Sequence, residues 1–127
     1  SALGNTAANK YIGTSNGNLL LSSNWSKGHI PHLNEDIKIN NTTPNLLTLS
    51  NNSNQIISCR SLKLSGNTTL NNNGTITINK SYGLGLFIET DATFNNYQAL
   101  NILMPCGKAL EIKGIMNSTG ITNIQKN

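Results

Sequence analysis

Residues 61–78, Ser-Leu-Lys-Leu-Ser-Gly-Asn-Thr-Thr-Leu-Asn-Asn-Asn-Gly-Thr-Ile-Thr-Ile, decide the fold because their apolar pattern returns 24 positions later in residues 85–102. Five apolar positions carry the repeat: Leu62, Leu64, Leu70, Ile76 and Ile78, then Leu86, Ile88, Phe94, Leu100 and Ile102. The first pair recurs as Leu110 and Ile112, and deleting about three residues adds Ile115 and Ile121 to the pattern. A fixed period of this length is the signature of a solenoid or array.

Short strands form the repeating unit. Each period contains bursts in which apolar and polar residues alternate, separated by clusters of Gly, Asn and Ser, which is the pattern of strands and turns. No long segment keeps a 3.6-residue period, so we expect almost no helix beyond a short N-terminal cap. We predict an all-β fold, a right-handed parallel β-helix with a coil of about 24 residues. An antiparallel β-sandwich or jelly roll remains the alternative, although a sandwich has no reason to repeat its own internal spacing.

The length of 127 residues fits one structural domain. We expect residues 1–35 to form an N-terminal lead-in, hairpin and cap, and residues 36–127 to form the coils of what looks like a fragment of a larger protein. Within the first part, residues 1–10 are expected to be a loose lead-in. Residues 11–13 and 19–21 are expected to pair as a hairpin around an Asn-Gly turn.

Composition narrows the function classes. Asparagine fills 23 positions, and stacked Asn side chains can hydrogen-bond one another along a solenoid. The net charge is +4, but the basic residues are spread singly along the chain, so we expect no nucleic-acid binding. No stretch is long and apolar enough for a membrane span, so we expect no membrane insertion. Cys59 and Cys106 fall two coils apart, beyond disulfide reach, and we expect two free, half-buried thiols.

A group of motifs resembles the opening module of large bacterial surface proteins. Asn24-Trp25-Ser26 and Gly28-His29-Ile30-Pro31 match two turns of that module, and Glu35-Asp36-Ile37-Lys38-Ile39 matches the strand that follows. Ser61-Leu62-Lys63-Leu64 and Gly74-Thr75-Ile76-Thr77-Ile78 match its later bursts. The chain looks like the right-handed β-helix of secreted adhesins and autotransporter passengers, and more loosely like viral and phage tail spikes. This resemblance implies an extracellular, cell-surface or virion-surface scaffold and names no ligand.

Four aromatic residues are candidates for a binding surface: Trp25, Tyr82, Phe87 and Tyr97. An exposed Trp25 indole would suit stacking on a sugar ring, whereas a buried one would plug the open end of the coil. Phe87 aligns with the outward-facing Lys63 in the repeat, and an outward apolar residue is a candidate contact. Tyr82 and Tyr97, in turns of adjacent coils, would join it, unless all three pack against outer loops.

The candidates for metal binding and catalysis are weaker. His29 and His32 lie near Glu35 and Asp36, but the pattern lacks the Cys or third His of a persuasive zinc site, and we expect neither metal nor cofactor. Glu89 and Asp91 would lie on the same side of a strand if that strand continued past them, and Glu111 falls one coil later. Five acidic residues in all are few for a polysaccharide-cleaving β-helix, so we expect no catalytic site.

The sequence therefore favours a non-catalytic attachment or structural module of a surface adhesin or a virus or phage fibre. Its expected partners are a cell-surface glycan or host receptor and flanking domains, and a homotrimer is one assembly that would cover open coil ends. The main alternative is a small carbohydrate-active enzyme of the lyase or hydrolase type. An ice-binding solenoid is a further alternative, since Thr69 and Thr93 align, but Thr75 aligns with Ala99 and interrupts a regular threonine ladder.

Overall fold

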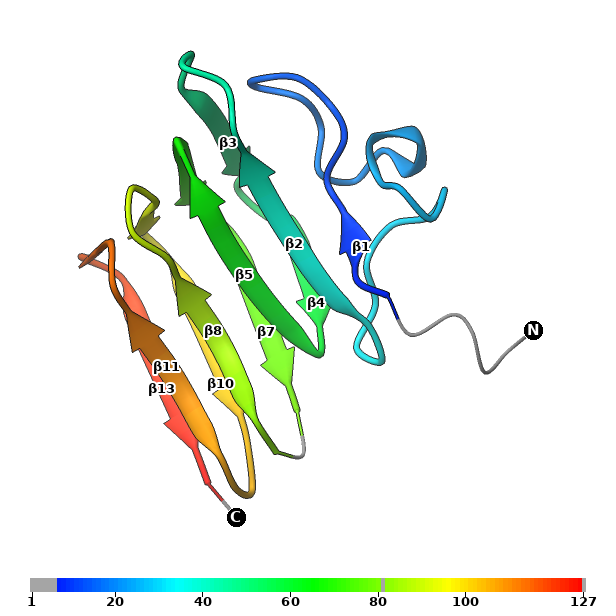
Figure 1. Ribbon diagram of the computed structural model, residues 1–127. Helices are drawn as coiled ribbons and strands as arrows, with labels where there is room; N and C mark the ends of the chain where they lie inside the picture. Colours follow the sequence, from blue (N-terminus) through cyan, green and yellow to red (C-terminus); the bar gives the residue numbers. More distant parts are fainter. Residues whose placement is uncertain (1–6, 81, 127) are drawn as a thin grey trace.

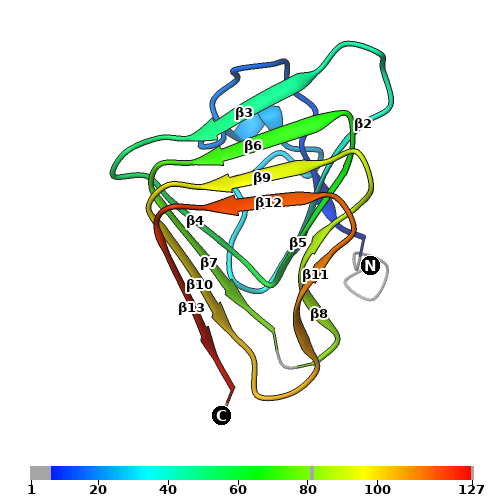
Figure 2. The ribbon, with the colours of Figure 1, turned by 90° about the vertical axis from the view of Figure 1, so that its left-hand side faces the viewer.

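The chain winds into a right-handed parallel β-solenoid with a triangular cross-section (Figures 1 and 2). The computed structural model describes residues 7–80 and 82–126. Each turn of the chain adds one strand to each of three sheets, which form the sides of the triangle. The predicted fold class is confirmed, and the antiparallel sandwich is excluded because the described strands pair in parallel.

Within the described residues, the first sheet has five strands, in the spatial order β1 (Asn9–Lys10), β2 (Asp36–Asn41), β5 (Ser61–Gly66), β8 (Leu84–Ile88) and β11 (Lys108–Ile112). The second sheet contains β3 (Leu47–Asn51), β6 (Thr68–Asn72), β9 (Thr93–Asn96) and β12 (Ile115–Ser118). The third sheet contains β4 (Ile56–Cys59), β7 (Thr75–Asn79), β10 (Ala99–Leu103) and β13 (Ile121–Gln125). The one helical element among the described residues is the 3₁₀ turn η2 (Ser22–Asn24), in the cap, as expected.

The core consists of equivalent apolar side chains stacked from coil to coil. Leu62 pairs with Leu86, and Leu86 pairs with Leu110. Because strands in register lie about 4.8 Å apart with equivalent residues on the same face, these side chains form a continuous inner ladder. Leu70 and Phe94 form a second ladder in the next sheet, and both are buried. Full burial of one such side chain stabilises the fold by roughly 1.5–3 kcal/mol.

The last coil departs from the predicted repeat. Met116, not Ile115, pairs with Phe94, so the coil is shorter by two residues and not by three. A shift of one residue moves a side chain to the opposite face of a strand. Ile115 and Ile121 therefore point outward, with 56% and 64% of their surface exposed.

Asparagine ladders line the solenoid, as the composition suggested. The Asn51 side-chain amide donates to Asn72 Oδ1 at 3.0 Å, and the Asn72 amide donates to Asn96 Oδ1 at 2.9 Å. All three residues are fully buried at the corner between the second and third sheets. A parallel outer ladder joins Asn71 to Asn95 at 2.9 Å. The side-chain amide groups of Asn51 and Asn72 each donate to the next coil, whereas Asn51 Oδ1, in the first rung of the ladder, is buried without a partner among the described residues.

The N-terminal cap differs from its prediction. Asn9–Lys10 is not loose but forms β1 alongside β2, and residues 1–6 lie outside the described part. The predicted hairpin is wrong, since Tyr11 bridges to Trp25 and residues 19–21 form no strand. The reason is packing: Trp25 is 2% exposed, meets the Tyr11 ring edge-on at a centroid distance of 5.6 Å, and donates from Nε1 to Leu19 O at 2.9 Å. Both aromatic rings thereby cover the end of the core.

The two cysteines are free, but neither is half-buried. Cys59 ends the inward-facing part of β4 and is fully buried, while Cys106 is exposed in the turn before β11. Burial is the main cause that raises the pKa of the Cys59 thiol far above its ordinary range, with the nearby charges of Asp36 and Glu35 adding to the effect. Cys59 is therefore an unreactive core residue.

Candidate functional site

The outer side of the first sheet gathers lysines that are far apart in the sequence. Lys10 pairs with Lys38, and Lys38 pairs with Lys63, so their side chains point outward in one row. Phe87 is the next member of the row, beside Lys63. Lys113 follows β11 and reaches the same place. We call these residues, Lys10, Lys38, Lys63, Phe87 and Lys113, the basic face.

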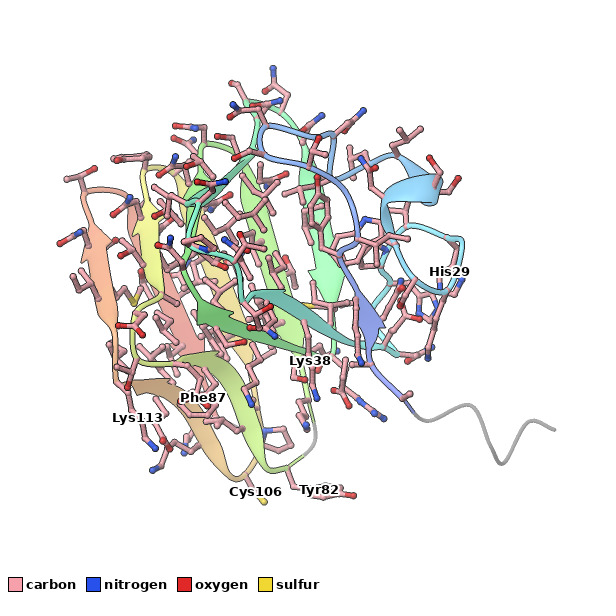
Figure 3. The ribbon with its side chains drawn as sticks, turned by 45° about the horizontal axis from the view of Figure 1, so that its top comes forward. His29, Lys38, Tyr82, Phe87, Cys106 and Lys113 are labelled. Atoms are coloured by element: carbon pink, nitrogen blue, oxygen red, sulfur yellow. The ribbon has the colours of Figure 1, made fainter. Side chains whose placement is uncertain are left out.

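Two ammonium groups lie close to the Phe87 ring. Lys63 Nζ lies 5.5 Å and Lys113 Nζ lies 5.6 Å from the centre of its ring, within cation–π range. Figure 3 shows Phe87 and Lys113 side by side toward the C-terminal end of the sheet, with Lys38 toward the N-terminal end. Lys63 also pairs with Glu89 at 3.5 Å. Among the ion pairs of the described residues, none involves Lys10, Lys38 or Lys113.

A groove of about 360 Å³ runs over this side of the first sheet. Lys38, Lys63 and Phe87 form part of its floor, and Ala7 and Ala8 of the N-terminal segment line it as well. Its size is at the lower end of the range for small-molecule sites. The groove therefore offers an apolar ring with two lysine ammonium groups beside it.

Asp36 and its cationic partners close one part of the groove. Arg60 donates from Nε to Asp36 Oδ1 at 3.1 Å and from Nη2 to Oδ2 at 2.7 Å, and Lys80 Nζ lies 3.5 Å from Oδ1. Burial by itself would raise the pKa of Asp36, but hydrogen bonds from Arg60 and Ser61 and the charges of Lys80 and Arg60 outweigh it and lower the pKa to about 2. Asp36 is therefore an ionised structural anchor at neutral pH.

Two of the four predicted aromatic residues, Tyr82 and Phe87, lie in adjoining hollows beside the first sheet. Tyr82, 71% exposed, lies at the corner before β8, where it lines a hollow with Asp36, Arg60 and Lys80 (Figure 3). Asp36 and Lys80 also line the groove that contains Phe87, so the two hollows adjoin.

The other two aromatic residues lie elsewhere. Tyr97, 48% exposed, occupies the turn between β9 and β10, at the corner between the second and third sheets. Trp25 is inside the cap, and its buried indole offers no face for stacking on a sugar. The burial of Trp25 therefore favours a plug at the end of the core over a platform for sugar stacking.

The acidic residues are not arranged as the repeat suggested. Strand β8 ends at Ile88, so Glu89 and Asp91 do not share one side of a strand. Asp91 instead has a positive φ of 76° in an exposed turn. Glu111 pairs with Phe87 across β8 and β11 and forms an ion pair with Lys108 at 3.1 Å. The carboxylates on this side of the molecule are thus engaged by cations.

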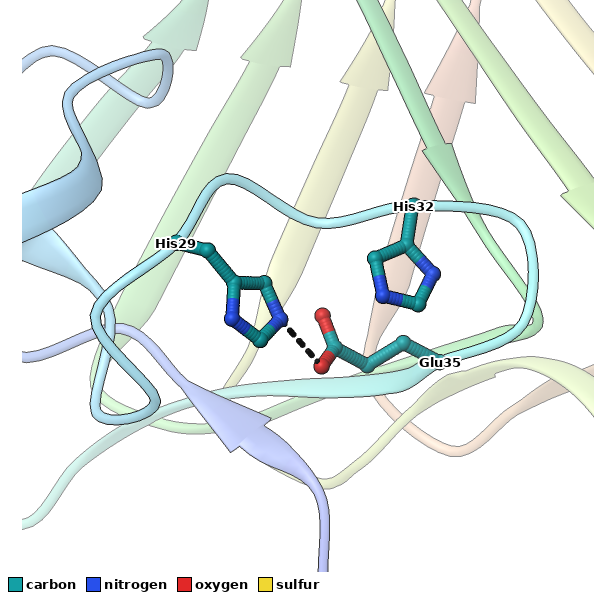
Figure 4. Close-up of side chains that lie close together, drawn as sticks. All are labelled: His29, His32 and Glu35. Atoms are coloured by element: carbon teal, nitrogen blue, oxygen red, sulfur yellow. Dashed lines mark hydrogen bonds and ion pairs between the residues drawn. The ribbon is translucent and has the colours of Figure 1, made fainter.

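The lysine row is not visible in the spacing of charges along the chain, because it depends on the positions of the lysines within the repeat. Lys63 follows Lys38 by 25 positions, and Phe87 follows Lys63 by 24. Applying the repeat to polar as well as apolar positions would have placed these residues in one row. A second group, His29, His32 and Glu35, gathers its potential metal ligands in the cap loop (Figure 4).

Comparisons of the chain with protein-family models, with curated proteins and with solved structures find no match. Among the described residues, no helix has the length and apolar character needed to cross a membrane.

Proposed function

We propose that this chain is a non-catalytic attachment module that binds an acidic glycan on its basic face. The observation that carries the proposal is the row of Lys38, Lys63 and Phe87 in register across neighbouring strands. An aromatic ring suits the apolar face of a sugar, and ammonium groups suit carboxylate or sulfate groups on it. Neighbouring rungs lie about 4.8 Å apart, so one oligosaccharide can contact several of them.

The centre of the basic face lies on a rigid part of the first sheet, which favours a preformed binding surface over one that forms by movement of the backbone. Lys38, Lys63 and Phe87 lie on β2, β5 and β8, each of which is paired with a strand on both sides, and the inner residues of these strands, such as Ile37, Leu62 and Leu86, are buried. The backbone positions that carry these side chains are therefore held at a fixed spacing before a ligand arrives, which reduces the ordering cost of binding. A surface adhesin or a virus or phage fibre, with a host-cell glycan as partner, is the setting we infer from the resemblance of the motifs.

The ionisation of Asp36 and the ion pair of Glu89 favour binding over catalysis. A glycosidase needs a carboxylic acid that holds a proton near neutral pH. Asp36, the acidic residue that lines the groove, has a pKa lowered to about 2 and carries no proton to donate. The alternative enzyme would use another acidic residue such as Glu89, which is paired with Lys63. Loss of polysaccharide turnover in Glu89→Gln would favour the enzyme.

A glycan array tests the proposal. The wild-type chain is expected to bind uronate-rich or sulfated glycans, and Phe87→Ala is expected to lose most of that signal. Tyr97→Ala is the matched control, because it removes an exposed aromatic ring at a different corner of the solenoid. Equal binding by wild type and Phe87→Ala, or binding that depends on Tyr97, would contradict the proposal. Competition with double-stranded DNA distinguishes glycan recognition from general polyanion binding.

A further inference from the structure

The cap loop brings three metal-ligating side chains together outside the basic face. His29, His32 and Glu35 each offer one ligand atom, and these atoms all lie within 4.8 Å of one another (Figure 4). His29 Nε2 is 2.7 Å from Glu35 Oε2, and the two imidazole rings are stacked with centroids 5.4 Å apart. The spacing His-x-x-His-x-x-Glu puts all three in a single seven-residue segment.

Glu35 is fixed in place before any ligand binds. It is buried, with 6% of its surface exposed, and its Oε1 accepts a hydrogen bond from the Asn9 amide at 3.0 Å. Asn9, itself fully buried, also donates to the His29 carbonyl at 3.0 Å and accepts from the Lys27 amide at 2.9 Å. One side chain thus orients both the carboxylate and the segment that carries the first histidine. A hydrogen-bonded second layer of this kind is what holds metal ligands in position.

The arrangement is also open on one side. His32 is exposed, and His29 has 44% of its side chain exposed. The three residues line a hollow together with Lys27, Asn34 and Arg60. A metal ion can therefore enter from solvent and keep water in its remaining coordination position.

We propose that His29, His32 and Glu35 form a binding site for Zn²⁺ or a similar borderline transition-metal ion. Zinc bonds of 2.0–2.2 Å in tetrahedral geometry place neighbouring ligand atoms about 3.3 Å apart. The His29–Glu35 pair would open slightly from 2.7 Å. The His32 ligand atom already lies within 4.8 Å of the other two, so the exposed His32 side chain would need only a small movement toward them. Two imidazoles and one carboxylate suit zinc, nickel or copper, whereas calcium and magnesium prefer oxygen ligands.

The ammonium group of Lys27 is expected to lower the affinity of the site for a metal ion. Its Nζ lies 3.8 Å from Glu35 Oε2 and competes for the carboxylate. A bound cation would displace this ammonium group, so the charge on Lys27 is expected to weaken the site. This gives a variant whose predicted effect is a gain in affinity.

Metal binding would fasten the cap to the first coil. Glu35 immediately precedes β2, and its carbonyl accepts a hydrogen bond from the Arg60 amide at 2.7 Å. His29 and His32 belong to the loop that follows the buried Trp25. A ligand that binds only the folded loop raises the melting temperature of the protein. This role is independent of glycan binding on the basic face.

Isothermal titration with ZnCl₂, in a Cys106→Ser background, tests the site. The substitution removes the exposed thiol, which is the obvious competing ligand. We expect one Zn²⁺ per chain, a rise in melting temperature, and no response to CaCl₂. His32→Ala should weaken binding by at least about tenfold. The His32 side chain is exposed and its Nδ1 accepts one hydrogen bond, of 3.3 Å, from the Asn34 amide, so this variant is expected to fold. Lys27→Gln should bind more tightly than the parent.

Proton NMR gives a second readout. The chain contains only two histidines, and Zn²⁺ should shift the ring signals of both. Absence of binding at millimolar Zn²⁺ would overturn the proposal. So would wild-type affinity in His32→Ala, or unchanged histidine signals, because the ion would then be bound elsewhere.

Discussion

Phe87 lies beside Lys63 in parallel register across β5 and β8, and Lys63 Nζ stands 5.5 Å from the centre of the Phe87 ring. These two residues are 24 positions apart in the sequence, one coil of the solenoid. The register that stacks Leu62 on Leu86 inside the core therefore also places a cation beside an aromatic ring outside it. The same repeat builds the core and the basic face.

Phe87→Ala should separate binding from stability. Phe87 points outward, so its loss should change the free energy of unfolding by about 1 kcal/mol or less while abolishing most glycan binding. Phe94→Ala should instead cost about 3–5 kcal/mol, because Phe94 is fully buried in the inner ladder. Urea unfolding of both variants checks this contrast. Similar losses for the two residues would show that Phe87 packs as a core residue.

The buried asparagine ladder should be expensive to interrupt. Asn72 donates to Asn96 Oδ1 and to the Ala99 carbonyl, and it accepts from the Asn51 amide. Asn72→Ala leaves these buried groups without their partners, and we expect a loss of about 3 kcal/mol in the free energy of unfolding. Asn71→Ala, in the outer ladder, is the control and should cost well under half of that. Urea denaturation gives both values, and equal costs would contradict a special role of the inner ladder.

Asp36 should make stability depend on pH in the acidic range. The pKa of Asp36 in the folded state, about 2, lies below the ordinary aspartate pKa of about 3.9. The ionised carboxylate therefore stabilises the folded state fully at pH values above about 3.9. This contribution is lost as the pH falls through about 2. Because the side chain is partly exposed, we expect Asp36→Asn to lose only about 1 kcal/mol at neutral pH.

The difference between wild type and Asp36→Asn should shrink as urea unfolding is repeated at progressively lower pH. Asp91→Asn is the matched control, since Asp91 is exposed in a turn and Asn tolerates its positive φ. A difference that stays constant with pH would mean that the carboxylate charge of Asp36 is not what stabilises the fold.

As an isolated 127-residue chain, the protein should self-associate through its last coil. Strands β11, β12 and β13 each end the order of their sheet, and inward-side residues such as Ile112 and Ile124 are 45% and 47% exposed. Edges that pair with no further strand among residues 7–80 and 82–126 can pair with another copy. Light scattering should show a mass that rises with concentration, and Ile124→Lys should reduce it. Ile12→Lys, at an exposed site in the cap, should leave it unchanged.

Much of the fold was predictable because a single repeat encodes it. The alternation around Leu62 and Leu86 gave the strands, and the constant 24-residue spacing gave the parallel stacking. The cap was less predictable because no repeat covers it, and the packing of Tyr11 against Trp25 overrode the expected Asn-Gly hairpin. In the last coil, a two-residue deletion exchanged the faces of Ile115 and Met116, a detail that local sequence does not specify.

The candidate sites were less predictable than the fold. Phe87 could be predicted as a surface residue because it places an apolar side chain at an outward position that Lys63 occupies in the preceding coil. The lysine row depends on registry between strands, and the burial of Trp25 depends on the path of the cap. The cap loop brings His29, His32 and Glu35 close together, and Asn9 holds this loop through its hydrogen bond to Glu35. That hydrogen bond joins residues 26 positions apart, so the spacing of the three ligands does not reveal it.

Chemical-shift mapping of the labelled protein with heparin, and with neutral dextran as control, tests the central claim most directly. The account predicts saturable amide shifts along β2, β5 and β8, centred on Lys38, Lys63 and Phe87, and no response to dextran. Residues of the opposite outer ladder, Asn95 and Asn117, should not shift. Shifts centred on that ladder, or none with any acidic glycan, would contradict attachment through the basic face.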